Sequence, residues 1–225
     1  AFAGRRVFLH QGAGTVLMSI TEKDLHLLSE EVGTRLSEKR YRHTLGVERM
    51  AKTLGEYFFS PERTAQLRAA ALLHDIAKEL PEKEQIALIR KGHFPVSEED
   101  LSSEPLLHAF AAPEVIRRDF PHFADESILH AVFCHTTGDT DMDTFDKIVF
   151  LSDFIEEGRT YSSCIRVRED LFAALSGGKE KERALNEAVL LTLDLTIASL
   201  LERRLNINLR TVKARNSMLA VLSRT

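Results

Sequence analysis

The feature that most constrains the fold is periodicity: apolar residues recur at helical spacing, and the alternation typical of strands is nearly absent. Two segments show this spacing at length. They are the series Val47, Met50, Ala51, Leu54 and Phe58, and a stretch over about 181–204 that aligns Ala184, Ala188, Leu191, Leu195 and Ala198. At 225 residues and 44% apolar content, the chain is long enough for one substantial core. The sequence predicts an all-α fold with one domain over 18–225.

Capping and breaking residues divide the chain into the expected helices. The expected starts are Thr21, Ser60-Pro61, Pro81, Asp125, Asp141–Asp143 and Thr211, and the expected ends are Gly92, Gly158 and Gly177-Gly178. The segment around His108 has two interpretations, because Pro113 disfavours a helix interior. A helix begins either at His108 or nearer Ala112.

The first seventeen residues differ in character from the rest. They combine Arg5-Arg6 with Gly12-Ala-Gly14 and show no clear period, whereas Met18 resembles a natural start before the cap at Thr21. We expect 1–17 to be an added or upstream segment. Its Gly-Ala-Gly lacks the Lys-Ser/Thr of a phosphate-binding loop.

Four residues form a set of metal-type ligands: His43, the adjacent pair His74-Asp75, and Asp153. Two imidazoles and two carboxylates suit a borderline divalent metal that can activate water. Neighbouring helical side chains point about 100° apart, so His74 and Asp75 can reach one ion only at a helix end or in a distorted turn. Asp153 lies among Leu151, Phe154 and Ile155, where an unpaired charge would be costly.

These residues and their surroundings resemble the HD-domain phosphohydrolases, whose pattern is a His, a His-Asp doublet and a distal Asp on separate helices. Within that superfamily the chain resembles the bacterial YqeK-type symmetrical diadenosine tetraphosphate hydrolases. The match covers roughly 20–160, with a weaker one at Thr211-Val-Lys-Ala-Arg215-Asn216. The matching segments are Arg40-Tyr-Arg-His43-Thr-Leu-Gly-Val, Ala-Leu-Leu-His74-Asp75-Ile-Ala-Lys78, Leu-Leu-His108-Ala, Ile-Leu-His130-Ala-Val-Phe-Cys-His135-Thr-Thr-Gly138, and Asp146-Lys-Ile-Val-Phe-Leu-Ser-Asp153-Phe-Ile-Glu-Glu-Gly-Arg159.

The resemblance implies an HD-domain helical bundle with additional C-terminal bracing helices, and it implies a role for each matching residue. One metal ion, expected to be iron, with manganese, cobalt or zinc as alternatives, would be bound by His43, His74, Asp75 and Asp153. The substrate would be contacted by Arg40, His43, Asp75, Lys78, His108, His130, Thr137, Gly138 and Arg159. The catalytic residues would be Asp75, His108 and His130.

The implied reaction is hydrolysis of diadenosine tetraphosphate, and of similar dinucleoside polyphosphates, by water that the metal activates. Attack at the middle of the tetraphosphate gives two ADP. Arg suits bidentate contact with phosphate, and Lys provides a point charge. His108 or His130 would protonate the leaving oxygen, since His titrates near neutral pH.

His130 and His135 have alternative interpretations. His130 lies among Ile128, Leu129 and Val132, where a single His is more often a hydrogen-bonded core residue. His135 is five residues on, about 140° round an ideal helix, so both reach one site only if the helix ends near Cys134. In an alternative arrangement, His130 and His135 bind a second metal together with His108. We expect one metal and not two.

Composition narrows the classes of partner. The net charge of −4 and the absence of a long basic run argue against nucleic acid, and no apolar run approaches the roughly 18 residues of a membrane span. Cys134 and Cys164 provide no disulfide framework. We expect a cytoplasmic protein with a small nucleotide as its partner, no nucleic acid and no membrane. A homodimer is left open.

Two other functions are compatible with these residues. One is a different HD phosphohydrolase, such as a nucleotide monophosphate phosphatase, which would release phosphate. The other is a nucleotide-sensing module that retains the metal and reports binding to a partner. The complete His43, His74-Asp75 and Asp153 set argues for hydrolysis, because a sensor need not retain every group that activates water.

Overall fold

The computed structural model describes residues 19–224, so the expectation for 1–17 lies outside the described residues. These residues form an all-α fold, as predicted, with no strand among them. The elements are α1 (Glu22–Gly33), α2 (Glu38–Phe58), α3 (Pro61–Leu73), α4 (Glu82–Lys91), α5 (Glu98–Leu101), η1 (Glu104–Leu106), α6 (Leu107–Asp119), η2 (Pro121–Phe123), α7 (Glu126–Cys134), α8 (Thr144–Ile155), α9 (Ser162–Ser176), α10 (Lys181–Glu202) and α11 (Leu209–Leu222).

Most predicted helix starts are confirmed. Thr21 caps α1 and Asp143 caps α8, each in a reciprocal capping box with the third residue of its helix. Ser60 and Asp125 accept hydrogen bonds from the first turns of α3 and α7. The predicted start of the last helix was wrong: Asn208 caps α11, and the predicted cap Thr211 lies inside it.

α6 begins at Leu107 and continues through Pro113, so His108 lies in its first turn. The alternative start nearer Ala112 is wrong. Leu107, Ala109, Phe110, Ala111 and Ala112 are all buried, and that packing outweighs the hydrogen bond that Pro113 cannot make.

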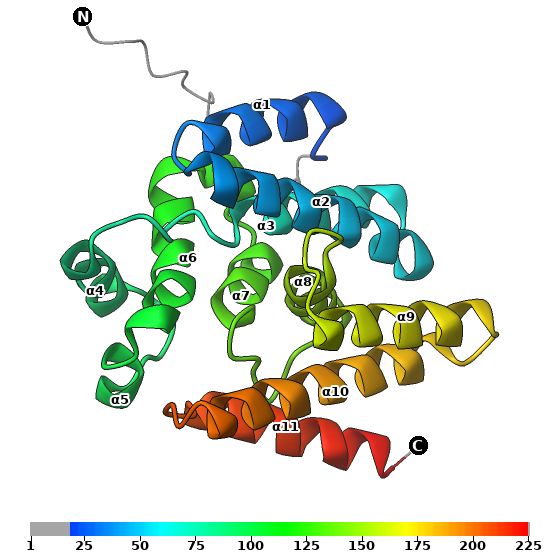
Figure 1. The fold of residues 1–225 in the computed structure, drawn as a ribbon. Coiled ribbons are helices and arrows are strands. Elements are labelled where there is room, and N and C mark those ends of the chain that lie inside the picture. Colours follow the sequence, from blue (N-terminus) through cyan, green and yellow to red (C-terminus); the bar gives the residue numbers. More distant parts are fainter. Residues whose placement is uncertain (1–18, 225) are drawn as a thin grey trace, which may run out of the picture.

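The helices pack in an order that brings distant segments together (Figure 1). α2 packs along α3 and α8, while α7 packs against α3, α6 and α8. α10 packs on α8, α9 and α11, so the C-terminal helices brace the far side of α8. The elements that carry His43, His74, His135 and Asp153 therefore share one core.

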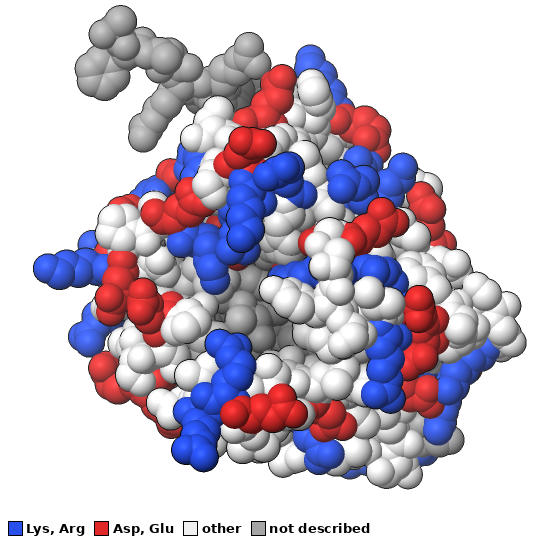
Figure 2. Space-filling model, in the orientation of Figure 1, with Lys and Arg blue, Asp and Glu red and all other residues white. Residues whose placement is uncertain are grey.

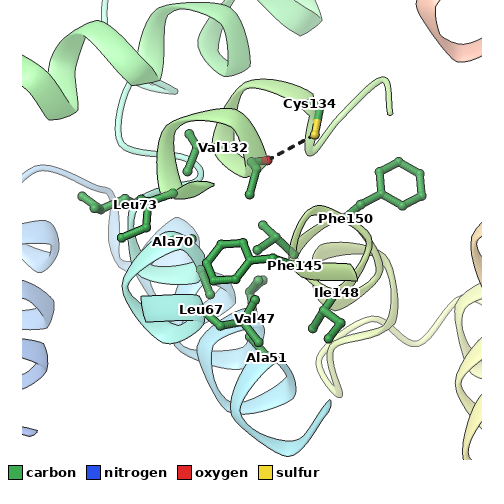
Figure 3. Close-up of a cluster of buried hydrophobic side chains, with 14 of the residues drawn as sticks. Val47, Ala51, Leu67, Ala70, Leu73, Val132, Cys134, Phe145, Ile148 and Phe150 are labelled. Carbon is green, nitrogen blue, oxygen red and sulfur yellow. Dashed lines mark hydrogen bonds between the residues drawn. The ribbon is translucent and has the colours of Figure 1, made fainter. Parts of the chain in front are cut away.

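Phe145 of α8 occupies the middle of that core and is 1% exposed (Figure 3). Its side chain lies among Val47 of α2 and Leu67 and Ala70 of α3. The fully buried run Ala69-Ala70-Ala71 lets the neighbouring helices approach α3 closely. Burial of each large side chain contributes about 1.5–3 kcal/mol, and together these contacts fix α2, α3 and α8 relative to one another.

α10 is the single helix among the described residues that is long and apolar enough to cross a membrane, and its most apolar 18-residue window has a mean hydropathy of 1.6. The packing of the other helices buries 39% of its most apolar window. One such helix is weak evidence for a membrane span, because core helices of other proteins meet the same criteria of length and composition.

Candidate metal centre

The four predicted ligands come from three packed helices. His43 lies in the second turn of α2, His74 is the C-terminal cap of α3, and Asp153 lies in the last turn of α8. Asp75 follows in a turn over 74–79. Because α3 ends at Leu73, His74 and Asp75 need not keep the roughly 100° separation of a helix. The expected helix end at this doublet is confirmed.

His43, His74 and Asp153 converge on one point. Nε2 of His43 lies 2.9 Å from Oδ1 of Asp153, and Nε2 of His74 lies 4.0 Å from the same oxygen. One donor atom from each of the three side chains lies within 4.8 Å of the others. Two imidazole nitrogens and a carboxylate oxygen at this spacing suit a divalent transition metal.

The remaining nitrogen of each imidazole is already engaged. Nδ1 of His43 donates to Oε1 of Glu156 at 3.2 Å, and Nδ1 of His74 donates to the carbonyl oxygen of Ala71 at 2.7 Å. Both Nε2 atoms are buried and have no hydrogen-bond partner in the described part of the chain. Metal-binding His residues have this arrangement, because an anchored Nδ1–H fixes the tautomer that leaves Nε2 free. The residues therefore fit a metal ion.

Asp75 also lies next to the imidazole of His74. Its Oδ2 is 3.3 Å from Nε2 of His74, and its Oδ1 is 3.1 Å from Nε2 of His108 and 4.0 Å from Nε2 of His135. His74, Asp75 and His135 form a second group with donor atoms within 4.8 Å of one another. The predicted ligands thus gather around His74, but as two overlapping sets rather than one.

His135 enters this second set because α7 ends at Cys134, the condition that its spacing from His130 required. Its side chain is 2% exposed, and its Nδ1 donates to the carbonyl oxygen of Val132 at 2.7 Å. Its ring centroid lies 5.0 Å from that of His74 and 5.2 Å from that of His108. The structure therefore brings His135 next to His74, and His108 next to His135 and Asp75.

The charges of the site depend on one another. Burial opposes the charge of Asp153, yet the close approach of His43 and the charge of Arg159 hold the pKa of Asp153 well below its usual range. Burial likewise opposes a charged His43, but the close approach of the Asp153 carboxylate and the hydrogen bond to Glu156 raise the pKa of His43 to about 9. Burial, with the charges of His74 and His108, lowers the pKa of His135 to about 3. The site holds ionised carboxylates and a neutral His135 imidazole.

Three predicted phosphate-binding cations surround the carboxylates. Nη1 of Arg40 donates to Oδ2 of Asp75 at 2.8 Å, and Nη2 of Arg159 donates to Oδ1 of Asp153 at 2.6 Å. Nζ of Lys78 lies 3.0 Å from Nδ1 of His108. Burial is the main reason that the pKa of Lys78 lies below its usual value, with the charge of Arg40 contributing in the same direction.

The structure does not bring His130 to the His74 cluster. Its Nδ1 donates to Oδ2 of Asp146 at 2.9 Å, and its ring lies 6.1 Å from that of Phe94. Neither Asp146 nor Phe94 belongs to the two ligand sets around His74. This hydrogen bond agrees with the alternative interpretation, in which His130 is a hydrogen-bonded residue of the fold, better than with a role in phosphate binding.

Gly138 packs against the C-terminal helices, and Thr137 precedes it in the same turn. Thr137 is 1% exposed, and its hydroxyl donates to the carbonyl oxygen of Gly138. Gly138 has a φ of 69°, and a Cβ there would lie 3.0 Å from Cβ of Ala214 in α11. This turn therefore fixes α11 against the bundle. Arg215, the other C-terminal match, pairs with Asp194 at 2.7 Å.

Two residues of the site were not among the predicted site residues: Glu156, which orients His43, and His135, which the sequence offered only as an alternative. Glu156 follows Asp153 by three residues, a spacing that places both on one helix face, and this was the available signal. Gly46 makes room for it, since a Cβ at 46 would lie 2.3 Å from Oε2 of Glu156. Such a long-range packing requirement cannot be read from α2 alone.

His43 forms part of the wall of a cleft of about 800 Å³. This cleft lies between the first half of α2, the turn after α3 and the segment that joins α8 to α9. Six Lys and Arg side chains and two Glu side chains line it, namely Lys39, Arg40, Arg42, Arg49, Lys78, Arg159, Glu79 and Glu156. The face that carries the α8–α9 segment is hollowed at its centre, and Lys and Arg side chains gather around the hollow (Figure 2). The site can therefore attract an anion with several charges.

Comparison with known protein families supports this geometry. The HD domain matches residues 40–158, the segment that contains every predicted ligand. A crystal structure of a predicted HD superfamily hydrolase involved in NAD metabolism, from Clostridium acetobutylicum, superposes with a TM-score of 0.74. The two sequences are 29% identical, and the match covers 89% of this chain and 97% of that one.

Similar sequences carry a common name. A symmetrical bis(5'-nucleosyl)-tetraphosphatase from Halalkalibacterium halodurans is 34% identical over 148 residues, which are 65% of this chain and 76% of that protein. The protein of the same name from Bacillus subtilis is 31% identical over 172 residues, covering 76% of this chain and 85% of that protein. The one from Staphylococcus aureus is 30% identical over 135 residues, 60% of this chain and 68% of that protein.

Proposed function

This chain belongs to the HD-domain family and to its YqeK-type phosphohydrolases, and we propose that it hydrolyses diadenosine tetraphosphate symmetrically to two ADP. Similar dinucleoside polyphosphates are included in the proposal. The observation that carries it is the pair of buried, unpartnered Nε2 atoms of His43 and His74, which face Asp153 beside a cleft lined by six cations. The two nitrogens have no hydrogen-bond partner among the described residues, and the cleft has six Lys and Arg side chains against two Glu.

We assign the metal to His43, His74 and Asp153, with Asp75 beside His74, and we propose that it is one ferrous ion. Nitrogen and carboxylate donors also accept manganese, cobalt or zinc. The availability of each metal in the cell and the coordination geometry of the site therefore decide which metal binds. When bound, the metal would lower the pKa of a water molecule and polarise the phosphoryl group. Glu156 would hold the ring of His43 in place through the hydrogen bond to Nδ1.

Arg40, Lys78 and Arg159 would bind the phosphates. Their present partners, Asp75, His108 and Asp153, hold them next to the proposed metal position before substrate arrives. A guanidinium can contact two phosphate oxygens at once, and this contact orients the polyphosphate of the substrate for in-line attack. These cations also offset the charge that develops in the transition state.

The bond changes are those of a phosphoanhydride hydrolysis. The oxygen of water forms a bond to one of the two central phosphorus atoms, and the bond from that phosphorus to the bridging oxygen breaks. The bridging oxygen leaves with the second ADP. Among the two predicted acids, His108 is the residue beside Asp75, so we assign proton transfer at the leaving oxygen to His108 and not to His130.

Anaerobic incubation of metal-analysed protein with diadenosine tetraphosphate, followed by chromatography, tests the proposal. ADP as the sole product, lost in the Asp75→Ala variant, supports it. AMP plus ATP would reject symmetrical cleavage. Release of inorganic phosphate from AMP would favour a monophosphate phosphatase, and no turnover at full metal occupancy would favour a sensor.

The proposed activity needs a free nucleotide as its partner and neither nucleic acid nor a membrane. We place the enzyme in the cytoplasm, where nucleotides are available. His43, His74, Asp75 and Asp153 all come from one chain, so the proposed site does not require a homodimer.

A further inference from the structure

α2 presents two neighbouring rows of side chains to the cleft. The inner row, Arg40 and His43, contacts the carboxylates of the site. The outer row consists of Lys39, Arg42 and Arg49, whose spacings of three and seven residues place them on one helix face. The outer row extends about 15 Å along the helix, which is longer than one phosphate group needs.

The two rows differ in how their charge is balanced. Arg40 and Arg159 each donate to a carboxylate of the metal site. In the outer row, the described part of the chain offers a carboxylate only to Arg42, whose Nε lies 3.9 Å from Glu38, while Lys39 and Arg49 form no ion pair. Lys39 and Arg49 share the cleft with other cations and form no ion pair within the described residues, so a bound anion would stabilise them.

An exposed aromatic side chain completes this outer region. Tyr161 lines the cleft two residues after Arg159, at the start of α9, and is 71% exposed. Within the described residues its ring stacks on no other ring. An exposed aromatic face beside cations is the combination that binds a nucleobase and the attached phosphates.

We propose that this outer region, Lys39, Arg42, Arg49 and Tyr161, binds the second nucleoside diphosphate half of a dinucleoside polyphosphate, with Tyr161 stacked on its base. The inference rests on the proposed function, because it assumes that one half of the substrate lies against Arg40, Lys78 and Arg159. The outer region then holds the half that leaves. It makes the enzyme select a tetraphosphate with nucleosides at both ends over one with a single nucleoside.

Steady-state kinetics on two substrates tests this inference. Diadenosine tetraphosphate is compared with adenosine 5′-tetraphosphate, which has the same phosphates but lacks the second nucleoside. The preference of the wild type for the first substrate should fall about tenfold in Tyr161→Ala, through KM rather than kcat, since stacking on an aromatic ring contributes at this scale. Tyr161→Phe should retain the preference because it keeps the ring.

Arg49→Ala tests the charged part of the region, with Arg166→Ala as the matched control. Arg166 is an exposed Arg of α9 that pairs with Asp170 and does not line the cleft. We expect Arg49→Ala to raise KM for diadenosine tetraphosphate and to weaken its dependence on salt, and Arg166→Ala to do neither.

Failure of the proposed function can be distinguished from failure of the outer region. If the wild type forms no ADP, the proposed function fails, and calorimetric binding of diadenosine tetraphosphate to the wild type and to Tyr161→Ala then tests the outer region without turnover. If ADP forms but Tyr161→Ala changes KM equally for both substrates, or for neither, the outer region is not a nucleoside subsite.

Discussion

At the scale of single residues, the anchoring of His43 is the feature that the proposed metal site most depends on. Glu156 is 5% exposed and accepts hydrogen bonds from Nδ1 of His43 and from the backbone N–H of Gly158. A carboxylate that orients a metal-binding His also increases the electron density on the coordinating nitrogen. Glu156 is therefore a positioning residue with a measurable effect on metal affinity.

We predict that Glu156→Gln lowers the affinity for ferrous or manganous ion about 10–100-fold, because it removes the charged acceptor that anchors His43. Competition against a metal-binding dye measures the affinity. Glu157→Gln is the control, since Glu157 is exposed and adjacent in sequence. Equal metal affinities for the two variants would show that Glu156 does not contribute to metal binding.

We predict that Gly46→Ala has the same effect by a steric route. The added Cβ would lie 2.3 Å from Oε2 of Glu156, so the carboxylate must move away from His43. Helix propensity alone favours Ala by about 1 kcal/mol, so a loss of metal affinity without a matching loss of stability would identify the displacement. In a Glu156→Gln background, Gly46→Ala should add little, and full additivity in this double-mutant cycle would contradict the mechanism.

The sequence was sufficient to place the four candidate ligands but not their partners. His43, His74, Asp75 and Asp153 carry a local pattern, and the structure gathers them around His74. The approach of Glu156 to Gly46 joins α8 to α2, which no local pattern encodes. The resemblance implied a site role for His130 and none for His135, and the approach of His135 to His74 depends on the end of α7 at Cys134.

At the scale of elements, α7 and α8 are joined by the pair of His130 and Asp146. The hydrogen bond to Asp146 raises the pKa of His130, although burial opposes the shift. Burial raises the pKa of Asp146, although His130 opposes that shift. Both directions mean that the folded state favours a proton on this pair.

The pH dependence of the free energy of unfolding follows from these directions. A group whose pKa is higher in the folded state stabilises fully below its unfolded pKa and loses that contribution as pH rises through its folded pKa. His130→Gln should therefore reduce the free energy of unfolding more at about pH 5.5 than at about pH 8, around the ordinary His pKa of about 6.5. Urea titrations of both proteins at both pH values measure it, and equal losses would contradict the pairing.

Helix ends were the most predictable features at this scale, because Thr21, Ser60, Asp125 and Asp143 act within one turn of their own helices. The error at Thr211 has a tertiary cause. Asn208 is held by a hydrogen bond from its side chain to buried Asp100, 108 residues away. That contact fixes the start of α11, and it is invisible to a local capping rule.

At the scale of the whole molecule, the proposed ligands link α2, α3 and α8, so metal binding should stabilise the fold. An ion at a thousandfold excess over its Kd stabilises a protein by about 4 kcal/mol if it binds the folded state alone. We predict that chelation lowers the melting temperature, that added ferrous or manganous ion restores it, and that Asp153→Asn removes most of this dependence. Calorimetric melting with and without metal measures it, and a metal-independent melting temperature in the wild type would contradict the assignment.

The fold class was predictable because helical periodicity extends along the chain, whereas the cleft was not. The cleft is formed by the start of α2, the turn after Leu73 and the segment after Ile155, which are far apart in sequence. Their approach depends on the burial of Phe145 and the alanines of α3. Long-range packing of this kind decides which cations of α2 line the same cavity.

Symmetrical cleavage requires water to attack a central phosphorus of diadenosine tetraphosphate, and hydrolysis in ¹⁸O-enriched water shows where the water oxygen goes. Mass spectrometry of the products from diadenosine tetraphosphate should show ADP alone, with one of every two ADP molecules carrying the label on its β-phosphate. AMP and ATP as products, or label on an α-phosphate, would contradict the account.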